Sequence, residues 1–399
     1  MINKYYSSML TEKDIIFEIF QYAQEKAKLV GEENIYDFSL GNPSVPAPSC
    51  VNQTMIDKLN SLNPLSLHGY SPSFGIMEVR EQIADSLNRT YGCHYTSSNI
   101  FMTIGAAGAL AHALRAVTNP GDEILTFAPC FSEYKPYTAG AGLKLTILPA
   151  NIDSFQINFD ALEKHLTPSV TALLINSPNN PSGIVYSTET IQKLSEILTE
   201  KSEEFGHPIY LISDEPYRDI IFKGTDSPYI ANFYKDTLTC YSFSKSLSLP
   251  GERIGYLAVS PECTYSKAII EICPQISRTI GQNGPASLMQ RTVGEVCTET
   301  SDLSVYEKNK NILFEALIEY GYSCVEPGGT FYMFPRSPEP DSYAFCEKAR
   351  EKNLMLVPGD IFGCPGHFRI AYCVPTERII KALPVFRELA EEYHLPNIK

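Results

Sequence analysis

Short apolar runs and amphipathic stretches alternate along the middle of the chain. From about residue 97, β-rich runs are separated by segments with helical periodicity, which predicts a mostly parallel sheet with helices on both faces. Most of the runs are apolar throughout, as strands buried on both faces require. The predicted strands are 99–104, 123–128, 144–149, 171–177, 208–214, 238–244 and 254–260. The predicted fold class is therefore α/β, with a large domain built on a mostly parallel seven-stranded sheet.

The segments between these runs have the pattern of crossover helices. Residues 188–201 place their aliphatic side chains on one helical face, and Ser187 or Thr188 can cap the helix. Parallel neighbouring strands need such crossover connections, so the helices and the sheet support the same prediction.

The pattern changes after about residue 285. The expected elements are then a long helix near 300–320, a strand pair at 322–327 and 330–335, a helix, a strand at 368–374 and a terminal amphipathic helix. This order predicts a second, smaller α+β domain. The expected parts of the chain are an N-terminal segment (1–45) that packs on the small domain or a partner subunit, a large domain (46–290) and the small domain (291–399).

Composition and charge exclude several classes of protein. The 399 residues are 44% hydrophobic, enough to bury a large core, and the net charge of −14 opposes a general affinity for nucleic acid or anionic membranes. The first residues lack a basic region followed by an apolar run, and no stretch approaches the length of a membrane span. A cytoplasmic protein without nucleic acid or membrane partners is expected.

Cysteine and histidine spacing gives no sign of disulfides or metals. The eleven cysteines are single residues spread from Cys50 to Cys373, which predicts free thiols in a reducing compartment. The seven histidines lack the spacing of metal ligands, so no metal site is expected.

Polar and small residues that follow strands are the first candidates for a site, because ligands of open parallel sheets bind at the carboxyl ends of the strands. The first strand leads into Gly105, Ala106, Ala107 and Gly108 at the start of a helix. Such a turn could bind phosphate through backbone N–H groups or could be ordinary packing. The absence of GxGxxG disfavours a dinucleotide-binding dehydrogenase.

Three later segments carry charged or polar side chains at strand ends. Residues 173–183 run into a Pro/Asn/Gly loop, which by itself indicates a turn. The strand that ends at Asp214-Glu215 delivers acids that need a cation or water, or that could cap a helix. Residues 242–256 place Lys245 just past a strand and Arg253 before the next one. An exposed lysine would be neutral, but a partly desolvated one is an amine nucleophile for a carbonyl.

These groups together match pyridoxal 5′-phosphate (PLP), which has an aldehyde, a pyridine nitrogen, a phenolic O3′ and a phosphate. At PNNPSG, DEPY, SFSKSLSLPGERIGY and FRIAYC, the chain resembles the fold-type I PLP enzymes, specifically the class I/II aminotransferases related to aspartate aminotransferase. The resemblance runs from Gly41 to Arg369 in the family's order and spacing.

The resemblance implies roles around the cofactor. Lys245 would form the Schiff base and move the substrate proton, Asp214 would pair with the ring nitrogen, and Tyr217 and Asn180 would bind O3′. The phosphate would be held by Ser242, Arg253 and the backbone of Gly105, Ala106 and Ala107. Phe131 is at the position of an aromatic ring stacked on the cofactor.

The resemblance also implies substrate contacts and an assembly. Arg369, assisted by Gly41 and Asn180, would bind the substrate α-carboxylate in a bidentate manner. Tyr70 matches a tyrosine that reaches the phosphate of a neighbouring subunit, so a homodimer with shared active sites is expected. Without the family pattern, the simpler interpretation would be favoured for three of these residues: Phe131 as a core residue, Tyr70 as a surface turn residue and Arg369 as an ion-pair partner.

The predicted activity is transfer of an amino group from an L-amino acid to a 2-oxo acid such as 2-oxoglutarate. A PLP-dependent C–S β-lyase of the cystathionine type is the alternative, because both reactions begin by removing the same proton. Arg278 resembles the arginine that binds a distal carboxylate across the dimer, which would make aspartate or glutamate the substrate; it could equally be an exposed loop residue. A PLP-binding regulatory module is disfavoured, since no DNA-binding domain or basic patch is present.

Overall fold

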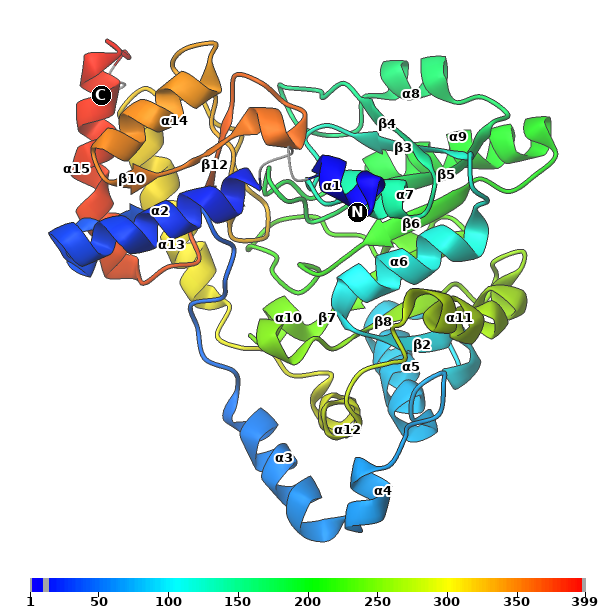
Figure 1. The fold of residues 1–399 in the computed structure, drawn as a ribbon. Helices are drawn as coiled ribbons and strands as arrows, with labels where there is room; N and C mark the ends of the chain where they lie inside the picture. Colours follow the sequence, from blue (N-terminus) through cyan, green and yellow to red (C-terminus); the bar gives the residue numbers. More distant parts are fainter. Residues whose placement is uncertain (1, 10–13, 397–399) are drawn as a thin grey trace.

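The large domain is built on one seven-stranded sheet. The computed structural model describes residues 2–9 and 14–396, and its central sheet has the strand order β2-β8-β7-β6-β5-β3-β4 (Figure 1). The strands are β2 (Ile100–Thr103), β3 (Glu123–Phe127), β4 (Lys144–Leu148), β5 (Val170–Asn176), β6 (Tyr210–Asp214), β7 (Thr237–Ser242) and β8 (Gly255–Val259). All seven predicted strands are present, so the predicted α/β class is confirmed.

Because β8 runs antiparallel to its neighbours, the residues before β8 lie at the same edge of the sheet as the residues after β2 and β7. β8 runs antiparallel to both of its neighbours, whereas the other pairings are parallel. The amino end of β8 therefore lies beside the carboxyl ends of β2 and β7. As a result Arg253, which precedes β8, lies at the same edge as Gly105 and Ser242, which lie at the ends of β2 and β7.

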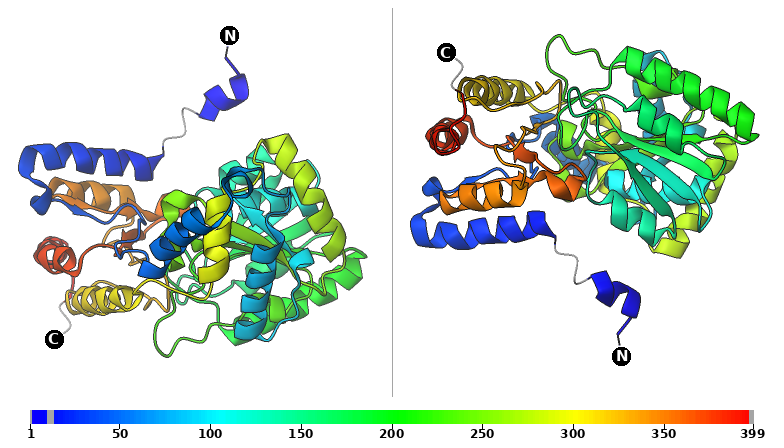
Figure 2. Two further views of the ribbon diagram at one scale, coloured as in Figure 1. Left: turned by 90° about the horizontal axis from the view of Figure 1, so that it is seen from below. Right: turned by 90° about the horizontal axis from the view of Figure 1, so that it is seen from above.

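Helices cover both faces of this sheet (Figures 1 and 2). On one face, α6 packs on the strands with Leu110 and Leu114, and α11 packs outside it. On the other face, α9 contributes Leu194 and Leu198. Ser187 is the residue that caps α9, through a hydrogen bond from the backbone of Thr190. The large-domain helices are α5 (Met77–Tyr91), α6 (Gly105–Val117), α7 (Tyr134–Gly140), α8 (Phe159–His165), α9 (Thr188–Phe205), α10 (Phe243–Ser246) and α11 (Ser266–Ile280).

A further helical group joins the large domain beside β2 and β8. It consists of α3 (Ser49–Ser61), α4 (Pro64–His68) and α12 (Ser287–Val296). α12 contacts α3, α4 and α5. The predicted boundary between the large and small domains, after residue 290, falls inside α12. The domain boundaries remain a prediction.

The smaller part of the fold has its own core. Its helices and strands are α13 (Ser304–Glu319), β9 (Tyr332–Met333), α14 (Ser342–Glu351), β10 (Leu354–Met355), β11 (Val357–Pro358), β12 (Phe368–Ala371) and α15 (Thr376–Glu392). The three strands β11-β12-β9 form an antiparallel sheet. Leu317, Phe345, Phe368 and Phe386 are buried together in the core that this sheet shares with the helices.

The predicted strand at 322–327 is wrong. These residues form no strand, and the backbone contact with the chain after β9 is a hydrogen bond from the N–H of Arg336 to the carbonyl of Ser323. Directly after this segment, Gly328 and Gly329 both donate to the carbonyl of Gly183 in the large domain. The end of this segment is thus bonded to the large domain, and the strand that pairs with β9 is β12.

The N-terminal segment extends along the small domain. It contains α1 (Lys4–Met9), α2 (Ile15–Val30) and β1 (Tyr36–Asp37). β1 pairs in parallel with β10, and α2 contacts β10 and β11. Figure 2 shows α1 lying apart from the remainder of the molecule. Short 3-10 helices occur at Glu32–Asn34, Ser97–Asn99, Ile230–Asn232, Pro250–Glu252 and Gly359–Phe362. Within the described ranges, every helix is too short or too polar to cross a membrane.

Candidate active site

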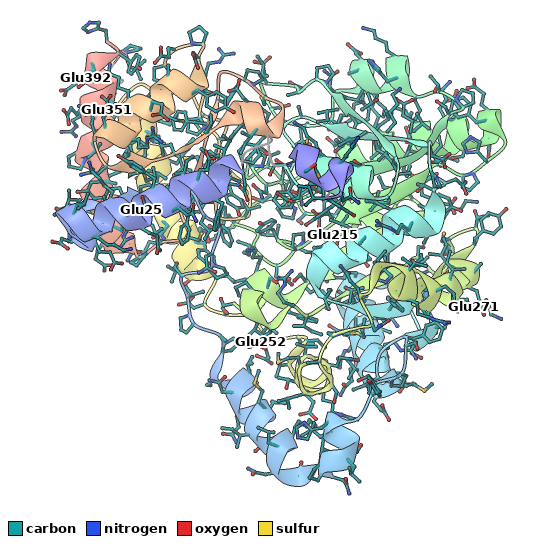
Figure 3. All side chains as sticks on the ribbon, viewed as in Figure 1. Glu25, Glu215, Glu252, Glu271, Glu351 and Glu392 are labelled. Carbon is teal, nitrogen blue, oxygen red and sulfur yellow. The ribbon has the colours of Figure 1, made fainter. Side chains whose placement is uncertain are left out.

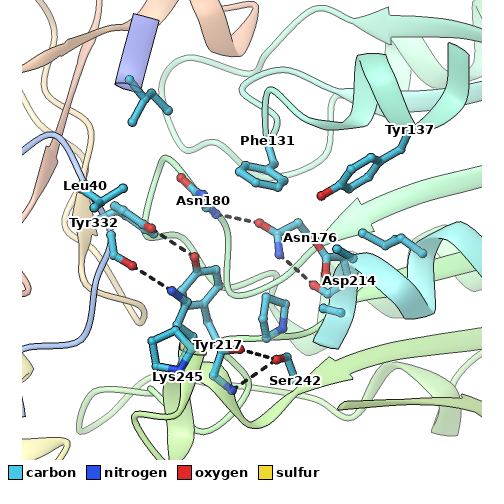
Figure 4. A pocket seen from close by; sticks show the side chains of 18 of the residues that line it. Leu40, Phe131, Tyr137, Asn176, Asn180, Asp214, Tyr217, Ser242, Lys245 and Tyr332 are labelled. Carbon is cyan, nitrogen blue, oxygen red and sulfur yellow. Dashed lines mark hydrogen bonds between the residues drawn. The ribbon is translucent and has the colours of Figure 1, made fainter. Parts of the chain in front are cut away.

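One cavity lies where the predicted polar residues meet, between the strand ends of the large sheet and the small domain (Figure 4). Its volume is about 280 Å³. The predicted residues that line it are Gly41, Ala106, Ala107, Phe131, Asn180, Asp214, Tyr217, Ser242, Lys245, Arg253 and Arg369. We call these residues the inner site. They come from segments far apart in the sequence, and the fold brings them around one space.

Lys245 lies in α10, directly after β7. Its Nζ donates a hydrogen bond to the carbonyl oxygen of Gly41 at 2.8 Å and lies 5.4 Å from the centroid of the Phe331 ring. Loss of hydration lowers the pKa of Lys245 to about 8, and the nearby guanidinium groups of Arg253 and Arg369 act in the same direction. A lysine with this pKa is partly uncharged near neutral pH, so its amine can attack a carbonyl.

The two acids at the end of β6 have different surroundings. Glu215 is only 2% exposed; it accepts a hydrogen bond from Ser213 at 2.7 Å and forms an ion pair with Arg218 at 3.1 Å. Figure 3 shows Glu215 in the interior, whereas Glu271 lies at the rim of the molecule. Because Glu215 already has a cationic partner, the carboxylate that remains for a ligand in the cavity is that of Asp214.

Asp214 has one bonded and one unbonded carboxylate oxygen. Oδ2 accepts a hydrogen bond from the hydroxyl of Tyr134 at 2.7 Å, while Oδ1 is buried without a partner in the described structure. Burial raises the pKa of Asp214 to about 7, and the hydrogen bond from Tyr134 opposes this increase. Asn176 fixes the backbone here by donating to the carbonyl of Asp214 at 2.7 Å. An unpartnered buried carboxylate oxygen is suited to a cationic N–H group of a ligand.

Tyr134 and Asn176 were not among the predicted site residues. Tyr134 is the first residue of α7. A tyrosine in apolar surroundings has the pattern of a core residue, so the sequence did not indicate its contact with Asp214. Asn176 is the last residue of β5. A polar residue at a strand end is a candidate site residue, so the sequence could have indicated Asn176. The prediction chose Asn180, in the loop that follows, instead.

Tyr217 and Tyr332 meet where the two parts of the fold join. Their hydroxyl oxygens are 3.1 Å apart, and burial raises the pKa of Tyr217 well above its usual value, so the phenol stays neutral. A Cβ atom on Gly41 would lie 1.8 Å from the hydroxyl of Tyr332, so only glycine fits beside it. Tyr332 is a further lining residue that the sequence did not reveal, because its hydrophobic surroundings predict a core strand.

Arg369 is 2% exposed and reaches the cavity from β12. Its Nη1 donates to Oδ1 of Asn180 at 2.9 Å and its Nη2 to the carbonyl of Ser39 at 2.6 Å. The guanidinium also lies over the rings of Tyr332 and Phe362, at 4.7 and 4.9 Å from their centroids. Among the described residues, no acidic side chain forms an ion pair with Arg369. A buried cation held by neutral groups is suited to binding an anionic substrate group.

A second group of donors suited to an anion lies at the ends of β2, β7 and β8. Gly105 starts α6 with φ of +71°, and a Cβ there would lie 3.0 Å from Nη2 of Arg253 and 3.5 Å from Oγ of Ser242. Oγ of Ser242 lies 2.6 Å from Oγ of Ser244. A helix N-terminus, a guanidinium and two hydroxyl groups thus converge. This set of donors fits a phosphate group.

The remaining wall of the cavity is mainly apolar. Phe131 and Tyr137 lie on one side of the cavity and Leu40, from the N-terminal segment, on the other (Figure 4). Ile16, also from the N-terminal segment, is a further lining residue. Ile16 and Leu40 were not predicted, because one apolar residue in an amphipathic helix or a loop gives no sign that it faces a ligand.

Tyr70 and Arg278 do not line the cavity of their own chain. Tyr70 is fully exposed beyond α4. Arg278 is exposed in the last turn of α11, where Nη1 donates to Oε1 of Gln275 at 3.3 Å. We call Tyr70 and Arg278 the outer pair. Their positions leave both side chains accessible to a second molecule.

The inner site fits PLP on observations of the structure itself. Lys245 offers an amine of lowered pKa, Asp214 an unpartnered oxygen, the Gly105 region an anion site and Phe131 an aromatic ring beside the cavity. When bound, PLP supplies an aldehyde that condenses with amines and a ring that accepts electrons from the substrate Cα. The fold and the site together define a fold-type I PLP enzyme.

Comparisons with known proteins give the family. Residues 33–385 match the model of "Aminotransferase class I and II". A crystal structure of an aminotransferase from Eubacterium rectale has a TM-score of 0.96 and 44% identity, with 98% of this chain and 99% of that chain covered. The aromatic-amino-acid aminotransferase 2 of Thermococcus litoralis is 28% identical, covering 95% of this chain and 96% of its own length. The aspartate aminotransferase of Thermotoga maritima is 29% identical, covering 90% and 93%.

The chain belongs to the aminotransferase class I and II family and is a PLP-dependent aminotransferase. Nothing in these comparisons supports the C–S β-lyase alternative, because the reported relatives are all named as aminotransferases.

Proposed function

We propose that this aminotransferase moves the amino group of an L-amino acid to a 2-oxo acid such as 2-oxoglutarate, with Lys245 as the residue that binds the cofactor covalently and transfers the substrate proton. The observation that best supports this role is the presence of Lys245 and Arg369 in one cavity. If Arg369 holds the substrate α-carboxylate, the Cα–H bond can face the amine of Lys245, and this orientation favours proton transfer over cleavage of other bonds at Cα.

The other inner-site residues are assigned to the cofactor in the same proposal. Asp214 would accept the ring N–H through its free Oδ1, and Tyr217 with Asn180 would bind O3′. Ser242, Arg253 and the backbone at Gly105, Ala106 and Ala107 would hold the phosphate, and Phe131 would stack on the ring. Their common position around one cavity supports these assignments.

A half-reaction experiment tests the activity and the donor. The PLP-loaded enzyme is mixed with each of the twenty common amino acids without a 2-oxo acid, and the cofactor absorbance is followed. A true donor converts the cofactor to its amine form, and added 2-oxoglutarate restores the original spectrum. Release of pyruvate and ammonia without such interconversion would instead indicate elimination and would overturn the proposal.

Aspartate or glutamate is the proposed donor, through Arg278. Relatives of this chain are named as aspartate, aspartate/prephenate and aromatic-amino-acid aminotransferases. Within the cavity, the positive side chains are Lys245, Arg253 and Arg369, and each already has a proposed partner. A distal carboxylate would therefore need a cation from outside this set, and Arg278 of a second subunit is the residue proposed to supply it.

The proposed assembly is a homodimer with shared active sites. Several large apolar side chains are exposed around α3, α4 and the start of α5, which supports a contact with a second copy of the chain. They are Ile56, Leu59, Leu65, Tyr70 and Met77. Light scattering coupled to size-exclusion chromatography tests the proposed stoichiometry directly, since a monomer with full activity would exclude shared sites.

Hybrid dimers test whether the outer pair acts across the interface. A chain with Lys245→Ala is co-expressed with a differently tagged chain carrying Arg278→Ala, and the mixed species is isolated through both tags. If Arg278 serves the neighbouring subunit, one of the two sites in the hybrid has both residues, and activity toward aspartate returns to about half of the wild-type value. If Arg278 serves its own chain, no site is complete and activity stays at about half of that of the Arg278→Ala homodimer.

A cytoplasmic location is also proposed. It is supported by the eleven cysteines, which are all free thiols, since disulfides are uncommon in reducing compartments.

A further inference from the structure

The hydroxyl of Tyr134 contacts one of the two carboxylate oxygens of Asp214. Tyr134 is the first residue of α7, and its side chain is 0% exposed. The hydroxyl donates to Oδ2 of Asp214 at 2.7 Å. Oδ1 is buried and has no partner in the described structure, and Asp214 lines the cavity. The carboxylate is thus bonded to the protein at one oxygen and unbonded at the other.

We propose that Tyr134 is a positioning residue of the reaction: its hydroxyl fixes the rotation of the Asp214 carboxylate and keeps it ionised, so that Asp214 can hold the cofactor ring nitrogen in its protonated form. This inference rests on the proposed role of Asp214. It adds a residue that touches neither the substrate nor the cofactor and that acts through Asp214 alone.

The turn before α7 explains how this contact is made accurately. The N–H of Tyr134 donates to the carbonyl of Phe131 at 3.2 Å, and the hydroxyl of Thr138 donates to the carbonyl of Tyr134 at 2.8 Å. The rings of Phe131 and Tyr134 meet edge to face, with centroids 5.8 Å apart. One turn therefore positions both the aromatic wall of the cavity and the partner of Asp214.

The backbone of Asp214 is fixed independently of this contact. Nδ2 of Asn176 donates to the backbone carbonyl of Asp214, and Oδ1 of Asn176 accepts from the N–H of Asn180 at 2.7 Å. β6 itself pairs with β5 and β7 up to Asp214. Removal of the Tyr134 hydroxyl is therefore expected to leave the main chain in place and to free only the carboxylate group.

The charges around Asp214 make a neutral donor important. The adjacent Glu215 raises the pKa of Asp214 further, beyond the effect of burial, while the hydrogen bond from Tyr134 lowers it. Burial and the nearby carboxylate raise the pKa of Tyr134 itself well above its usual value, so the phenol keeps its proton and acts only as a donor. Without that donor, Asp214 gains a proton more easily and loses the charge that stabilises a protonated ring nitrogen.

The test is Tyr134→Phe, which removes one hydroxyl and keeps the ring. Because hydrogen bonds to charged groups are among the stronger ones, we expect kcat to fall by roughly ten- to a hundredfold. KM for the amino acid should change little, since Arg369 is untouched. The dissociation constant for PLP should rise, and the pH midpoint of the visible absorbance of the lysine–cofactor linkage should move upward, because a less positive ring holds the linkage proton more tightly.

A matched control is Tyr234→Phe. Tyr234 is also a buried tyrosine of the large domain, and its hydroxyl donates to the carbonyl of Ile209 at 2.8 Å, away from the cavity. Both variants should show a similar thermal stability, but only Tyr134→Phe should change the PLP affinity and the pH midpoint. Equal effects of the two variants on every readout would reduce Tyr134 to a general packing role and would overturn the inference.

A double-mutant cycle with Asp214→Asn separates the inference from the assignment on which it rests. If Tyr134 acts through Asp214, adding Tyr134→Phe to Asp214→Asn has almost no further effect on PLP affinity or on the pH midpoint. Additive effects would contradict the inference while the role of Asp214 stands. If Asp214→Asn itself leaves both readouts unchanged, the proposed role of Asp214 fails as well.

Discussion

The inner site and the outer pair differ in how firmly the chain holds them. Asp214, Asn180 and Arg369 are buried, and each has a hydrogen-bond partner within the same chain. Tyr70 and Arg278 are exposed and do not line the cavity of their own chain. The residues proposed for the chemistry are thus fixed by folding, whereas those proposed for the phosphate of a neighbour and for the distal carboxylate depend on assembly.

This contrast predicts two kinds of mutational effect. Changes in the inner site should affect all substrates, because every amino acid presents the same α-amino and α-carboxylate groups. Changes in the outer pair should be selective or modest, because they remove contacts that are not part of the common chemistry.

The largest effect is expected from Lys245→Ala. Without the amine, the visible absorbance of the bound cofactor and nearly all turnover should disappear for every donor. Absorbance spectroscopy and borohydride trapping measure the linkage directly. Lys267→Ala, at an exposed position of α11, is the matched control and should retain both signals. Retention of trapped cofactor in the Lys245 variant would show that another residue forms the bond.

Arg369→Lys should be the next most damaging change. Lysine keeps the charge but cannot make the bidentate contact, and it leaves the acceptors of Asn180 and Ser39 without the donors they have now. We expect kcat/KM to fall by roughly ten- to a hundredfold for all donors alike. A loss restricted to one class of amino acid would move Arg369 from the α-carboxylate to the side chain of the substrate.

The pH dependence of cofactor capture tests the electrostatics of the inner site. Only the uncharged amine of Lys245 can attack the aldehyde, and its pKa is lowered to about 8 by burial. For cofactor-free enzyme, the rate of linkage formation should therefore rise as the pH increases through about 8 and level off above that value. Stopped-flow absorbance measures this rate. A midpoint near the usual lysine value would mean that the amine is hydrated and that the cavity opens widely without the cofactor.

Arg278→Ala should have a selective effect. If Arg278 of a second subunit binds the distal carboxylate, KM for aspartate and glutamate should rise by roughly tenfold or more, while KM for neutral amino acids stays unchanged. Steady-state kinetics with one donor of each class measures the difference. Arg387→Ala, an exposed position in α15, serves as the control. Equal effects on dicarboxylic and neutral amino acids would contradict the proposal that Arg278 binds a distal carboxylate. The apolar wall formed by Ile16 and Leu40 would then be the main determinant of substrate specificity.

The smallest effect is expected from Tyr70→Phe. A single hydrogen bond to a phosphate that other groups already hold should be worth about 1 kcal/mol, or several-fold in PLP affinity. Equilibrium titration with PLP measures this change, and kcat at saturating cofactor should stay close to normal. An unchanged affinity would exclude Tyr70 from the shared site.

The sequence predicted the interior of the molecule better than its connections. Continuous apolar runs identified every strand of the large sheet, because a strand buried on both faces leaves a signal that does not depend on tertiary detail. The proposed strand at 322–327 failed because its course depends on hydrogen bonds from Gly328 and Gly329 to a loop far away in the sequence. Local pattern contains no information about such contacts.

The same distinction applies to the cavity. Lys245, Asp214 and Arg253 were identifiable because charged residues at the ends of buried strands need an explanation. Tyr134 and Tyr332 were not, because a tyrosine in apolar surroundings has the pattern of a core residue, and only the structure shows that its hydroxyl meets another polar group.

The order in which the cavity is assembled has a consequence for how the enzyme acquires its vitamin. The walls include Ile16 and Arg369, which lie far apart in the sequence. A ribosome must therefore have synthesised the chain from Ile16 through Arg369 before a finished pocket can exist, and the coenzyme cannot bind a complete site before that point. Loading is then a step that follows translation, so the fraction of active enzyme in a cell should respond to vitamin B6 supply after the protein has been made.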